Sequence, residues 1–255
     1  MSEYIKHVID AKVLSLSIDR ADKKNALDLT MYQALANAIN AANEDKSIRV
    51  IVIKGTDDSF CSGNDIKDFL KNPPKDDSSP VLQFVRAIMN AEKPLVAAVN
   101  GIAVGIGVTM LLHCDLVFAV EEARFQMPFV NIGLCPEAGS TYILPAMMGH
   151  RKASELLLLG KMFDVDTAID VGIVNEKVSS TSLYEVVDEV AAKIAAQPPA
   201  ATQTTKRLLR AAMHEQTLAA AGRENDSFMP MLGGEECKEA LTAFMEKRPA
   251  DFSKF

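Results

Sequence analysis

One carboxylate stands out in this chain because of where it lies. Glu137 sits in a mostly apolar stretch between Pro136 and the run 138–140, Ala-Gly-Ser, which predicts a loop that turns into a helix. A carboxylate withdrawn from water in such a place holds a proton more tightly and is a stronger base. An acidic residue in the first turn of a helix can also simply complement the helix dipole, and the local sequence alone favours that interpretation. The role of Glu137 therefore depends on the segments around it.

Two segments contain distinctive sequence motifs, and further matching residues occur elsewhere along the chain. Residues 60–66 read Phe-Cys-Ser-Gly-Asn-Asp-Ile and follow a strand-like run at 50–54. Residues 94–145 join a buried strand, a glycine-broken turn, an apolar helix and Glu137. With these motifs, and with Asp19-Arg20 and Lys-Asn-Ala-Leu at 24–27, the chain resembles the crotonase, or enoyl-CoA hydratase/isomerase, superfamily over nearly its whole length.

The resemblance implies an oxyanion hole. In this family two backbone N–H groups hold the thioester oxygen of an acyl-coenzyme A, and the matching positions here are Ser62 and Ile106. Gly63 follows the first, and Gly105 and Gly107 flank the second. Glycine permits positive φ and a close approach of the backbone to a ligand, which suits this role. Close packing of a strand on a helix would favour the same small residues.

The two glutamates of the family's hydratases are replaced here. In those enzymes one glutamate activates water and the other delivers the proton, and the matching positions fall on Thr109 and Phe129. A hydroxyl and a phenyl ring do not match a carboxylate in that work, which disfavours hydration. The acid lies instead at Glu137, in the pattern Pro-Glu-Ala-Gly-Ser, which looks like that of the peroxisomal-type Δ3,Δ2-enoyl-CoA isomerases.

The resemblance therefore implies an isomerase that moves the double bond of a 3-enoyl-CoA to the 2-position. Glu137 would take a proton from the carbon α to the thioester and return it to the γ carbon, while burial among apolar residues raises its pKa. We expect no metal, and no cofactor apart from the coenzyme A of the substrate. The residues expected to bind the acyl-CoA are Lys24, Ala26, Ser62, Gly63, Asn64, Asp65, Ile66, Gly105, Phe129, Ile132 and Leu134.

Other functions on the same scaffold stay open. One is another acyl-CoA reaction, such as hydration, thioester hydrolysis or dehalogenation, and a second is a catalytically silent acyl-CoA-binding or RNA-associated member. A serine esterase is weakened because the sequence has no Gly-x-Ser-x-Gly motif. Nucleic-acid binding is weakened by the net charge of −7 and the pI near 5.2. Acyl chain length, cis or trans preference and pathway are not specified.

The basic residues and the cysteines give further expectations, about how coenzyme A is bound and about the redox environment of the protein. The phosphates of coenzyme A need basic partners or helix N-termini, and Lys23 and Lys24 are candidates. Lys247, Arg248 and Lys254 could contribute from the C-terminal end, although for each of these residues taken singly the ordinary solvated-surface interpretation is favoured. The cysteines, at 61, 114, 135 and 237, show no C-x-x-C pair and no metal-ligand spacing with histidine, which indicates a reduced intracellular protein. We interpret Cys135 as a small buried hydrophobe and His113 as a structural residue at a helix end.

Localisation signals are weak. The N-terminus lacks the apolar core of a secretory signal, and the final Ser-Lys-Phe differs in its last residue from the peroxisomal Ser-Lys-Leu address. The apolar stretch 95–112 is long enough for a membrane span, but its glycines favour a buried strand, turn and helix. We expect a cytoplasmic protein without membrane association.

The elements that would position these residues alternate between strand and helix. A hairpin is expected at 5–9 and 13–18, a helix at 29–43 with Thr30 and Gln33 in capping-box register, and a helix at 105–113. A Pro-, Asp- and Ser-rich link covers 72–80. Helices follow beyond Gly139, among them 200–213, 218–228 and 235–246. This alternation indicates an α/β protein with a parallel sheet.

The resemblance refines this fold into a crotonase-type spiral of repeated β-β-α units, followed by a helical trimerisation region. Pro198-Pro199 marks the expected boundary, which gives a core with the acyl-CoA site at 1–197 and a C-terminal helical region at 198–255. A homotrimer, or a hexamer made as a dimer of trimers, is implied by the resemblance alone.

Overall fold

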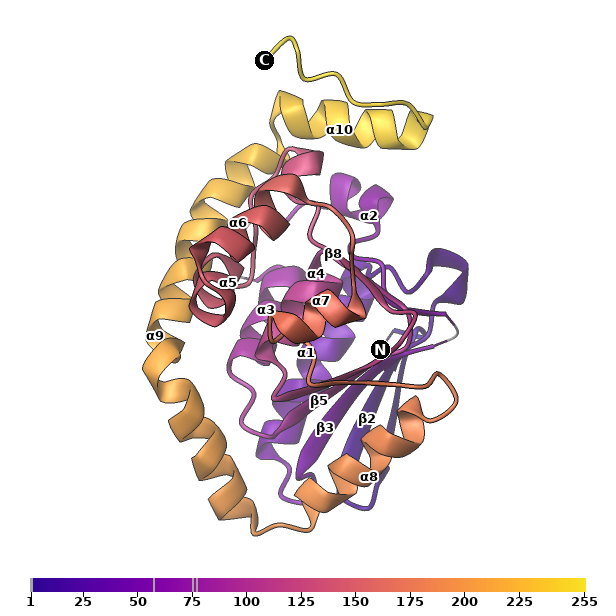
Figure 1. Cartoon of the computed structure of the whole chain (residues 1–255), viewed down its shortest axis with the longest axis vertical. Helices are drawn as coiled ribbons and strands as arrows, with labels where there is room; N and C mark the ends of the chain where they lie inside the picture. Colours follow the sequence, from indigo (N-terminus) through magenta and orange to yellow (C-terminus); the bar gives the residue numbers. More distant parts are fainter. Residues whose placement is uncertain (1, 57, 75, 77) are drawn as a thin grey trace.

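The computed structural model describes residues 2–56, 58–74, 76 and 78–255 of the chain (Figure 1). Within the predicted link 72–80, residues 75 and 77 lie outside the described residues. Two sheets form the body of the protein, and the C-terminal helices run along its side and end.

The larger sheet has six strands and is mostly parallel. Its strands, in spatial order, are β1 Ile5–Asp10, β2 Val13–Ile18, β3 Val50–Gly55, β5 Leu95–Val99, β7 Leu116–Val120 and β10 Glu176–Val178. β1 and β2 form the predicted antiparallel hairpin, and every later pair is parallel. β3 and β5 are buried along nearly their whole length, as expected for parallel strands covered on both faces.

The smaller sheet was not predicted. Its four strands, in spatial order, are β4 Ser59–Cys61, β6 Ile102–Val104, β8 Arg124–Gln126 and β9 Phe163–Asp164. Each has two or three residues, which is too short to produce a readable alternation of apolar and polar side chains. Three times in succession a strand of the larger sheet leads into a strand of the smaller one, and helical segments follow each pair. This repeat confirms the predicted spiral of β-β-α units.

Ten α-helices are found in the described residues, together with single 3₁₀ turns η1 (Ala21–Lys23), η2 (Met110–His113) and η3 (Val130–Ile132). Helix α8 lies against the larger sheet, while the long α9 runs along one side of the molecule and α10 projects at its end (Figure 1). The helices are α1 Leu29–Glu44, α2 Ile66–Lys71, α3 Pro80–Met89, α4 Ile106–Thr109, α5 Ser140–Met148, α6 His150–Leu159, α7 Val165–Asp170, α8 Leu183–Ala195, α9 Pro199–Leu232 and α10 Glu235–Glu246.

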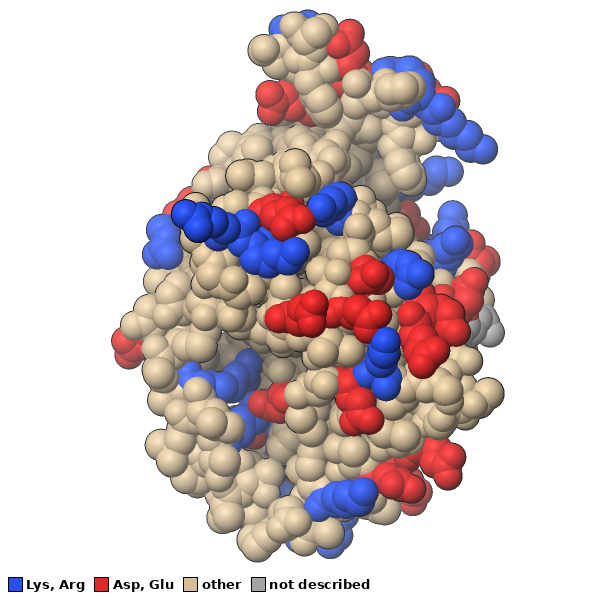
Figure 2. Space-filling view, viewed as in Figure 1, with Lys and Arg blue, Asp and Glu red and all other residues tan. Residues whose placement is uncertain are grey.

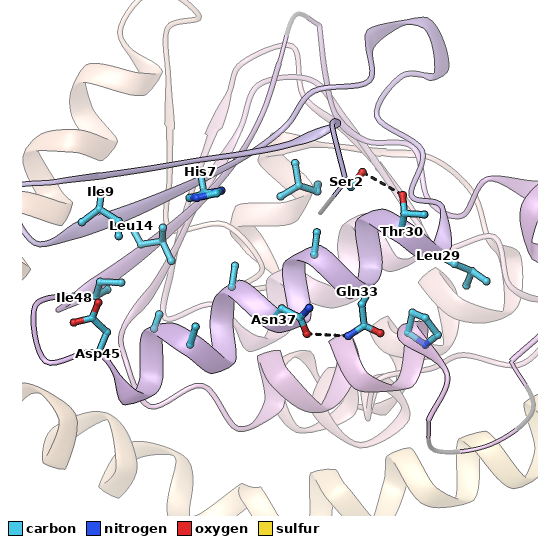
Figure 3. Close-up of a pocket in the computed structure, with 16 residues that line it drawn as sticks. Ser2, His7, Ile9, Leu14, Leu29, Thr30, Gln33, Asn37, Asp45 and Ile48 are labelled. Atoms are coloured by element: carbon cyan, nitrogen blue, oxygen red, sulfur yellow. Dashed lines mark hydrogen bonds between the residues drawn. The ribbon is translucent and has the colours of Figure 1, made fainter.

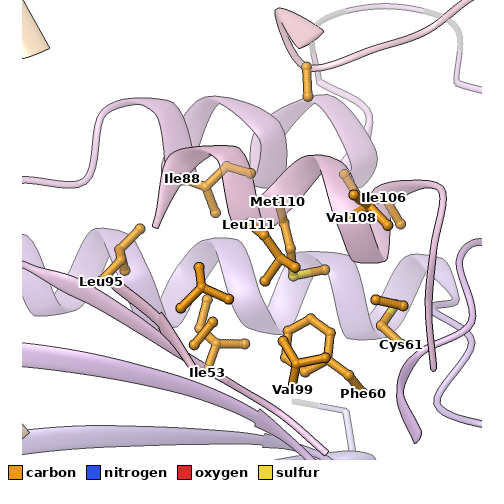
Figure 4. Close-up of a cluster of buried hydrophobic side chains, with 14 of the residues drawn as sticks. Ile53, Phe60, Cys61, Ile88, Leu95, Val99, Ile106, Val108, Met110 and Leu111 are labelled. Atoms are coloured by element: carbon orange, nitrogen blue, oxygen red, sulfur yellow. The ribbon is translucent and has the colours of Figure 1, made fainter. Parts of the chain in front are cut away.

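The core joins strands to the helices that carry the site. Ile53 and Val99 from the larger sheet face Ile88 of α3 and Leu111 of η2, with Phe60 of β4 beside them (Figure 4). These side chains are almost completely buried, and each such burial contributes roughly 1.5–3 kcal/mol to the stability of the folded chain. The core therefore fixes β4 and η2, the segment that directly follows α4, relative to the sheet.

Two helix predictions need correction. The capping box expected at Thr30 and Gln33 is wrong, because the carboxylate of Asp28 caps α1 by accepting the N–H of Met31 at 2.9 Å. The helices expected at 200–213 and 218–228 are one continuous helix, α9. The polar run 214–217 interrupts the apolar pattern but contains no helix breaker, and Thr217 is itself buried.

The apolar stretch 95–112 is divided into the strand β5, a turn region and the helical segments α4 and η2, as its glycines indicated, although the turn region also contains the unpredicted strand β6. Among the helices that the structure describes, none combines the length and hydrophobicity that a membrane span requires. The C-terminal region packs onto the core, since Ala221 and Phe228 of α9 and Leu241 of α10 belong to the same hydrophobic cluster as the sheet.

Candidate active site

Glu137 lies in a tight turn that leads into α5. Ala138 and Gly139 both adopt positive φ, 59° and 74°, and the N–H of Ser140 donates to the carbonyl oxygen of Glu137 at 3.1 Å. A Cβ on Gly139 would lie 2.7 Å from Cγ2 of Thr217 on α9, so this position requires glycine for both its conformation and its size. The turn is therefore pressed against the C-terminal helix.

The Glu137 side chain is 7% exposed, and its surroundings change its acidity. Burial raises its pKa to about 7, the negative charge of Glu224 adds to the rise, and a hydrogen bond from Thr109 partly opposes it. A carboxyl group with this pKa is substantially ionised at neutral pH and is a much stronger base than an exposed glutamate. The predicted effect of desolvation on Glu137 is confirmed in direction.

Helix α4 brings the second predicted backbone donor beside this carboxylate. Thr109 is fully buried, and its hydroxyl donates to Oε1 of Glu137 at 3.3 Å. Ile106 precedes Thr109 by about one helical turn and is the first residue of α4. At that position the N–H cannot reach a carbonyl of its own helix and points out from the N-terminus.

The loop of Ser62 packs directly against α4 and the strand before it. A Cβ on Gly107 would lie 2.4 Å from the carbonyl oxygen of Cys61, and one on Gly63 would lie 3.1 Å from that of Val104. Glycine thus serves the close strand–helix contact and, through that contact, brings the Ser62 segment to the N-terminus of α4. The packing and oxyanion-hole interpretations of these glycines are compatible.

The Glu137 carboxylate also acts on the Cys61 thiol, next to Ser62, and on Tyr32 of α1. Burial raises the pKa of the Cys61 thiol to about 12, a hydrogen bond to Gly63 opposes the rise, and Glu137 adds to it. Burial and then Glu137 also raise the pKa of Tyr32 on α1. The structure therefore brings Glu137, the Ser62 segment and the start of α4 into one site.

The Ser62 amide has a protein partner in this arrangement. Its N–H donates to the carbonyl oxygen of Lys24 at 3.1 Å, and its hydroxyl donates to the carbonyl oxygen of Lys23 at 3.1 Å. Lys24 and Asn25 both have positive φ, 48° and 59°, and the Asn25 amide anchors this bend by donating to the carbonyl oxygen of Ser59 at 2.7 Å. A thioester oxygen at Ser62 would have to share or replace the Lys24 carbonyl.

Two residues that were predicted to contact the acyl-CoA, Asp65 and Asn64, form hydrogen bonds with other residues of the protein. The carboxylate of Asp65 caps α2, accepts the N–H of Lys67 at 3.1 Å and lies 3.0 Å from Nη2 of Arg20. The Oδ1 atom of Asn64 accepts a hydrogen bond from the hydroxyl of Tyr32. Both residues thus hold the shape of the loop that carries Ser62.

The other residues predicted to bind the acyl-CoA differ in how exposed they are. Phe129 and Leu134 are buried and Ile132 is half-buried, in the loop that precedes Glu137. Lys24 is exposed, Ala26 is buried, and Ile66 and Gly105 are half-buried at the starts of α2 and α4.

Two residues hold the Glu137 turn through contacts that the sequence did not reveal, although His113 was interpreted as a structural residue at a helix end. His113 is buried, and its Nε2 lies 2.8 Å from the carbonyl oxygen of Ala138. Burial is the main reason that its pKa falls to about 4, so the ring is neutral and Nε2–H donates to that oxygen. Glu224 of α9 accepts hydrogen bonds from Gly139 and Thr141 on the same turn. The apolar helix before His113 gave no signal for this contact, and Glu224 is distant in sequence.

The candidate phosphate-binding residues fall into two groups. Lys23 and Lys24 are exposed beside the Ser62 loop. At the C-terminal end, Nη1 of Arg248 lies 2.6 Å from Oε1 of Glu239, and Nζ of Lys254 lies 3.8 Å from Oε2 of the same carboxylate. Figure 2 shows basic and acidic side chains interspersed over the visible face, without one basic stripe.

A wide groove of about 790 Å³ lies elsewhere, between the β1–β2 hairpin and α1 (Figure 3). Its walls include Ile5, Ile9, Leu14 and Ile48, and none of the predicted site residues lines it. Within the described part of the chain, no three His, Cys, Asp or Glu side chains gather into a group that could hold a metal ion.

Comparisons with known proteins agree with this fold. The sequence model of the enoyl-CoA hydratase/isomerase family matches residues 8–254. The chain is 33% identical to the 2,3-dehydroadipyl-CoA hydratase of Escherichia coli K12 over 94% of its own length and 95% of that protein. It is 32% identical to human enoyl-CoA delta isomerase 2 over 92% of its own length and 61% of that protein.

Among solved structures, an enoyl-CoA hydratase/isomerase from Pseudoalteromonas atlantica T6c superposes with a TM-score of 0.94 at 37% identity, covering 98% of this chain and 100% of that one. Relatives named as hydratases and as isomerases both occur, so the comparisons identify the family and leave the reaction within it open. This chain belongs to the enoyl-CoA hydratase/isomerase family.

Proposed function

We propose that the protein is an enoyl-CoA delta-isomerase that converts a 3-enoyl-CoA to a 2-enoyl-CoA. The observation that carries the proposal is the buried Glu137 carboxylate, which is hydrogen-bonded to α4 close to the Ile106 amide and has a pKa of about 7. A base and an oxyanion donor on neighbouring elements are what proton abstraction beside a thioester requires.

In the first step, Glu137 takes a proton from C2 of the bound 3-enoyl-CoA. The electrons of the broken C–H bond delocalise into the thioester, and the resulting dienolate oxygen is stabilised by the N–H groups of Ser62 and Ile106. In the second step, the protonated Glu137 returns the proton to C4, so that the double bond moves from C3=C4 to C2=C3. One carboxylate performs both transfers, and each preorganised donor contributes about 2.7–4 kcal/mol to lowering the barrier.

Isomerisation is favoured over hydration by the residues around the site. Thr109 and Phe129 occupy the positions where the family's hydratases carry their two glutamates, by the resemblance described above. The Thr109 hydroxyl donates to Glu137, and Phe129 is buried. Hydration needs a group that orients and activates water and another that delivers a proton, whereas isomerisation needs one base.

The proposal is tested by incubating the purified protein separately with 3-hexenoyl-CoA and 2-hexenoyl-CoA. We expect 3-hexenoyl-CoA to be converted to the conjugated 2-enoyl thioester, with at most slow formation of a 3-hydroxyacyl product from 2-hexenoyl-CoA. Hydration of 2-hexenoyl-CoA at a rate above that of isomerisation would replace this function with hydratase activity. Release of free coenzyme A as the main product would indicate a thioesterase.

We also propose that copies of the chain associate into a trimer, or a hexamer of two trimers, through the C-terminal helices. Leu208 and Leu209 of α9 are 66% and 77% exposed, and Phe244 of α10 is 66% exposed. Large apolar side chains exposed on neighbouring helices support a role in association.

A further inference from the structure

The carboxylate of Glu224 is aimed at the turn that carries Glu137. Its Oε2 accepts the N–H of Gly139 at 2.6 Å, and its Oε1 accepts both the N–H and the hydroxyl of Thr141, at 2.8 and 2.5 Å. Glu224 is 4% exposed, although it lies on the long surface helix α9. Three donors from one short segment therefore converge on a single buried side chain.

This arrangement is best satisfied by an ionised carboxylate. All three groups that face Glu224 act as donors here, and an ionised carboxylate accepts hydrogen bonds at both oxygens. A glutamine would place an NH₂ group against either Gly139 or Thr141 and lose at least one of these bonds. The N-terminus of α5, at Ser140, also favours a negative charge through the helix dipole.

Other contacts fix α9 so that Glu224 has a defined place. Nζ of Lys206 on α9 lies 2.7 Å from both Oδ2 of Asp115 and the carbonyl oxygen of Lys93, and it is almost completely buried. Thr217 of α9 packs against Gly139, as described above. Helix α9 is thus anchored beside the larger sheet and beside the turn, and Glu224 extends that anchor to the residues after Glu137.

Glu224 is also the charged group that acts most strongly on Glu137. Burial is the largest cause of the raised pKa of Glu137, Glu224 is the second, and the hydroxyl of Thr109 opposes them. Burial raises the pKa of Glu224 itself, while the hydrogen bonds from Thr141 and Gly139 and the charge of Arg223 oppose that rise. The other titratable groups around the turn are His113, which is neutral, and Tyr32, Cys61 and Cys135, whose pKa values are raised mainly by burial.

We propose that Glu224 is a positioning residue of the active site, which holds the Glu137 turn by its backbone and places a second negative charge beside the base. Its role as a positioning residue rests on the proposed function of Glu137 as the catalytic base. The electrostatic part can be measured without any substrate. Glu224 would thereby make the reactivity of Glu137 depend on the docking of the C-terminal helix.

The experiment compares Glu224→Gln, which removes the charge, with Glu224→Asp, which keeps the charge but shortens the side chain. Glu215→Gln, an exposed site on the same helix, is the matched control. The titration of Glu137 is followed by NMR of protein labelled with ¹³C at the glutamate carboxyl carbon, and its signal is identified by its loss in Glu137→Gln. Isomerase kcat and KM are measured on the same proteins with 3-hexenoyl-CoA.

In Glu224→Gln we expect the pKa of Glu137 to fall from about 7 towards the ordinary glutamate value, because the neighbouring charge is lost. We expect kcat to fall by roughly 10- to 100-fold in both Glu224 variants with little change in KM, because the turn loses its anchor. Glu224→Asp should keep the pKa of Glu137 raised, and Glu215→Gln should change neither quantity. An unchanged pKa of Glu137 in Glu224→Gln, or wild-type kcat in both Glu224 variants, would overturn the proposal.

If the Glu224 variants do not fold, Thr141→Val and Thr141→Ser decide the question. Thr141 is exposed, and valine removes only its hydroxyl donor to Glu224. We expect Thr141→Val to lower kcat several-fold and Thr141→Ser to restore it, whereas wild-type kcat in Thr141→Val would overturn the positioning role. If the wild type does not isomerise 3-hexenoyl-CoA, the proposed function fails, while the NMR titration still decides whether Glu224 controls Glu137.

Discussion

Replacing Glu137 by glutamine should make the protein more stable in alkaline solution. The pKa of Glu137 rises from an ordinary 4.5 to about 7 on folding, mainly because the side chain is buried. One pKa unit corresponds to about 1.36 kcal/mol, so keeping this group ionised in the folded state costs about 3 kcal/mol. Glutamine fills nearly the same volume, can accept the hydrogen bond from Thr109 through its carbonyl oxygen, and carries no charge.

The sign of the pH dependence follows from proton binding. Because the folded pKa lies above the unfolded one, the folded state binds more protons between these values, and the wild type loses stability as the pH rises from 4.5 to about 7. The Glu137→Gln variant does not lose stability in this way, because its glutamine does not ionise. The difference in the free energy of unfolding should therefore be small near pH 4 and should approach about 3 kcal/mol in favour of the variant at about pH 8.

Urea unfolding followed by circular dichroism, at pH values of about 5 and about 8, measures this difference. If the protein is oligomeric, the protein concentration must be matched between samples, because dissociation shifts apparent stability. Glu215→Gln is the control for loss of an exposed glutamate on α9. A stability difference that is the same at both pH values would refute the reasoning, since it would mean that Glu137 titrates normally in the folded protein.

The other predictions concern turnover and assembly. The rate of isomerisation should rise with pH through a pKa of about 7, because Glu137 must be ionised to act as a base, and a rate already maximal at pH 5 in a pH–rate profile would contradict this. Ser62→Ala should keep most of the activity, because it retains the backbone N–H. Ile106→Pro should abolish turnover, since it removes a donor at a helix position that tolerates proline, and equal losses in steady-state assays of the two variants would refute the backbone oxyanion hole. Light scattering should give the mass of a trimer or hexamer of the 27.7 kDa chain, and a fully active monomer would contradict that assembly.

Much of the site could be predicted from local sequence because glycine and proline mark its backbone. Gly63 and Gly107 identify where a loop meets α4, and the structure shows that their missing side chains permit that contact. Glu137 was singled out by the resemblance to the family's isomerases, because its local sequence alone favoured a helix-dipole role. The larger sheet was likewise predictable, since β3 and β5 are long apolar runs.

The parts that could not be predicted depend on long-range contacts or on very short elements. Glu224 lies in a polar part of α9, and its role arises only when that helix packs against the turn of Gly139 and Thr141. The hydrogen bond from Ser62 to the Lys24 carbonyl depends on two consecutive residues with positive φ, neither of which is glycine. The smaller sheet is made of strands too short to show a period.

The most direct test of the account is the isomerase activity of Glu137→Gln measured beside its affinity for acyl-CoA. Conversion of 3-hexenoyl-CoA should fall by roughly 100- to 10,000-fold, because the base is lost, while calorimetry should show nearly unchanged binding of a saturated acyl-CoA. Glu215→Gln should retain wild-type turnover and binding, which shows that the loss is specific to the buried carboxylate. If Glu137→Gln isomerised 3-hexenoyl-CoA at the wild-type rate, Glu137 would not be the base, and its place at the start of α5 would be explained by the helix dipole alone.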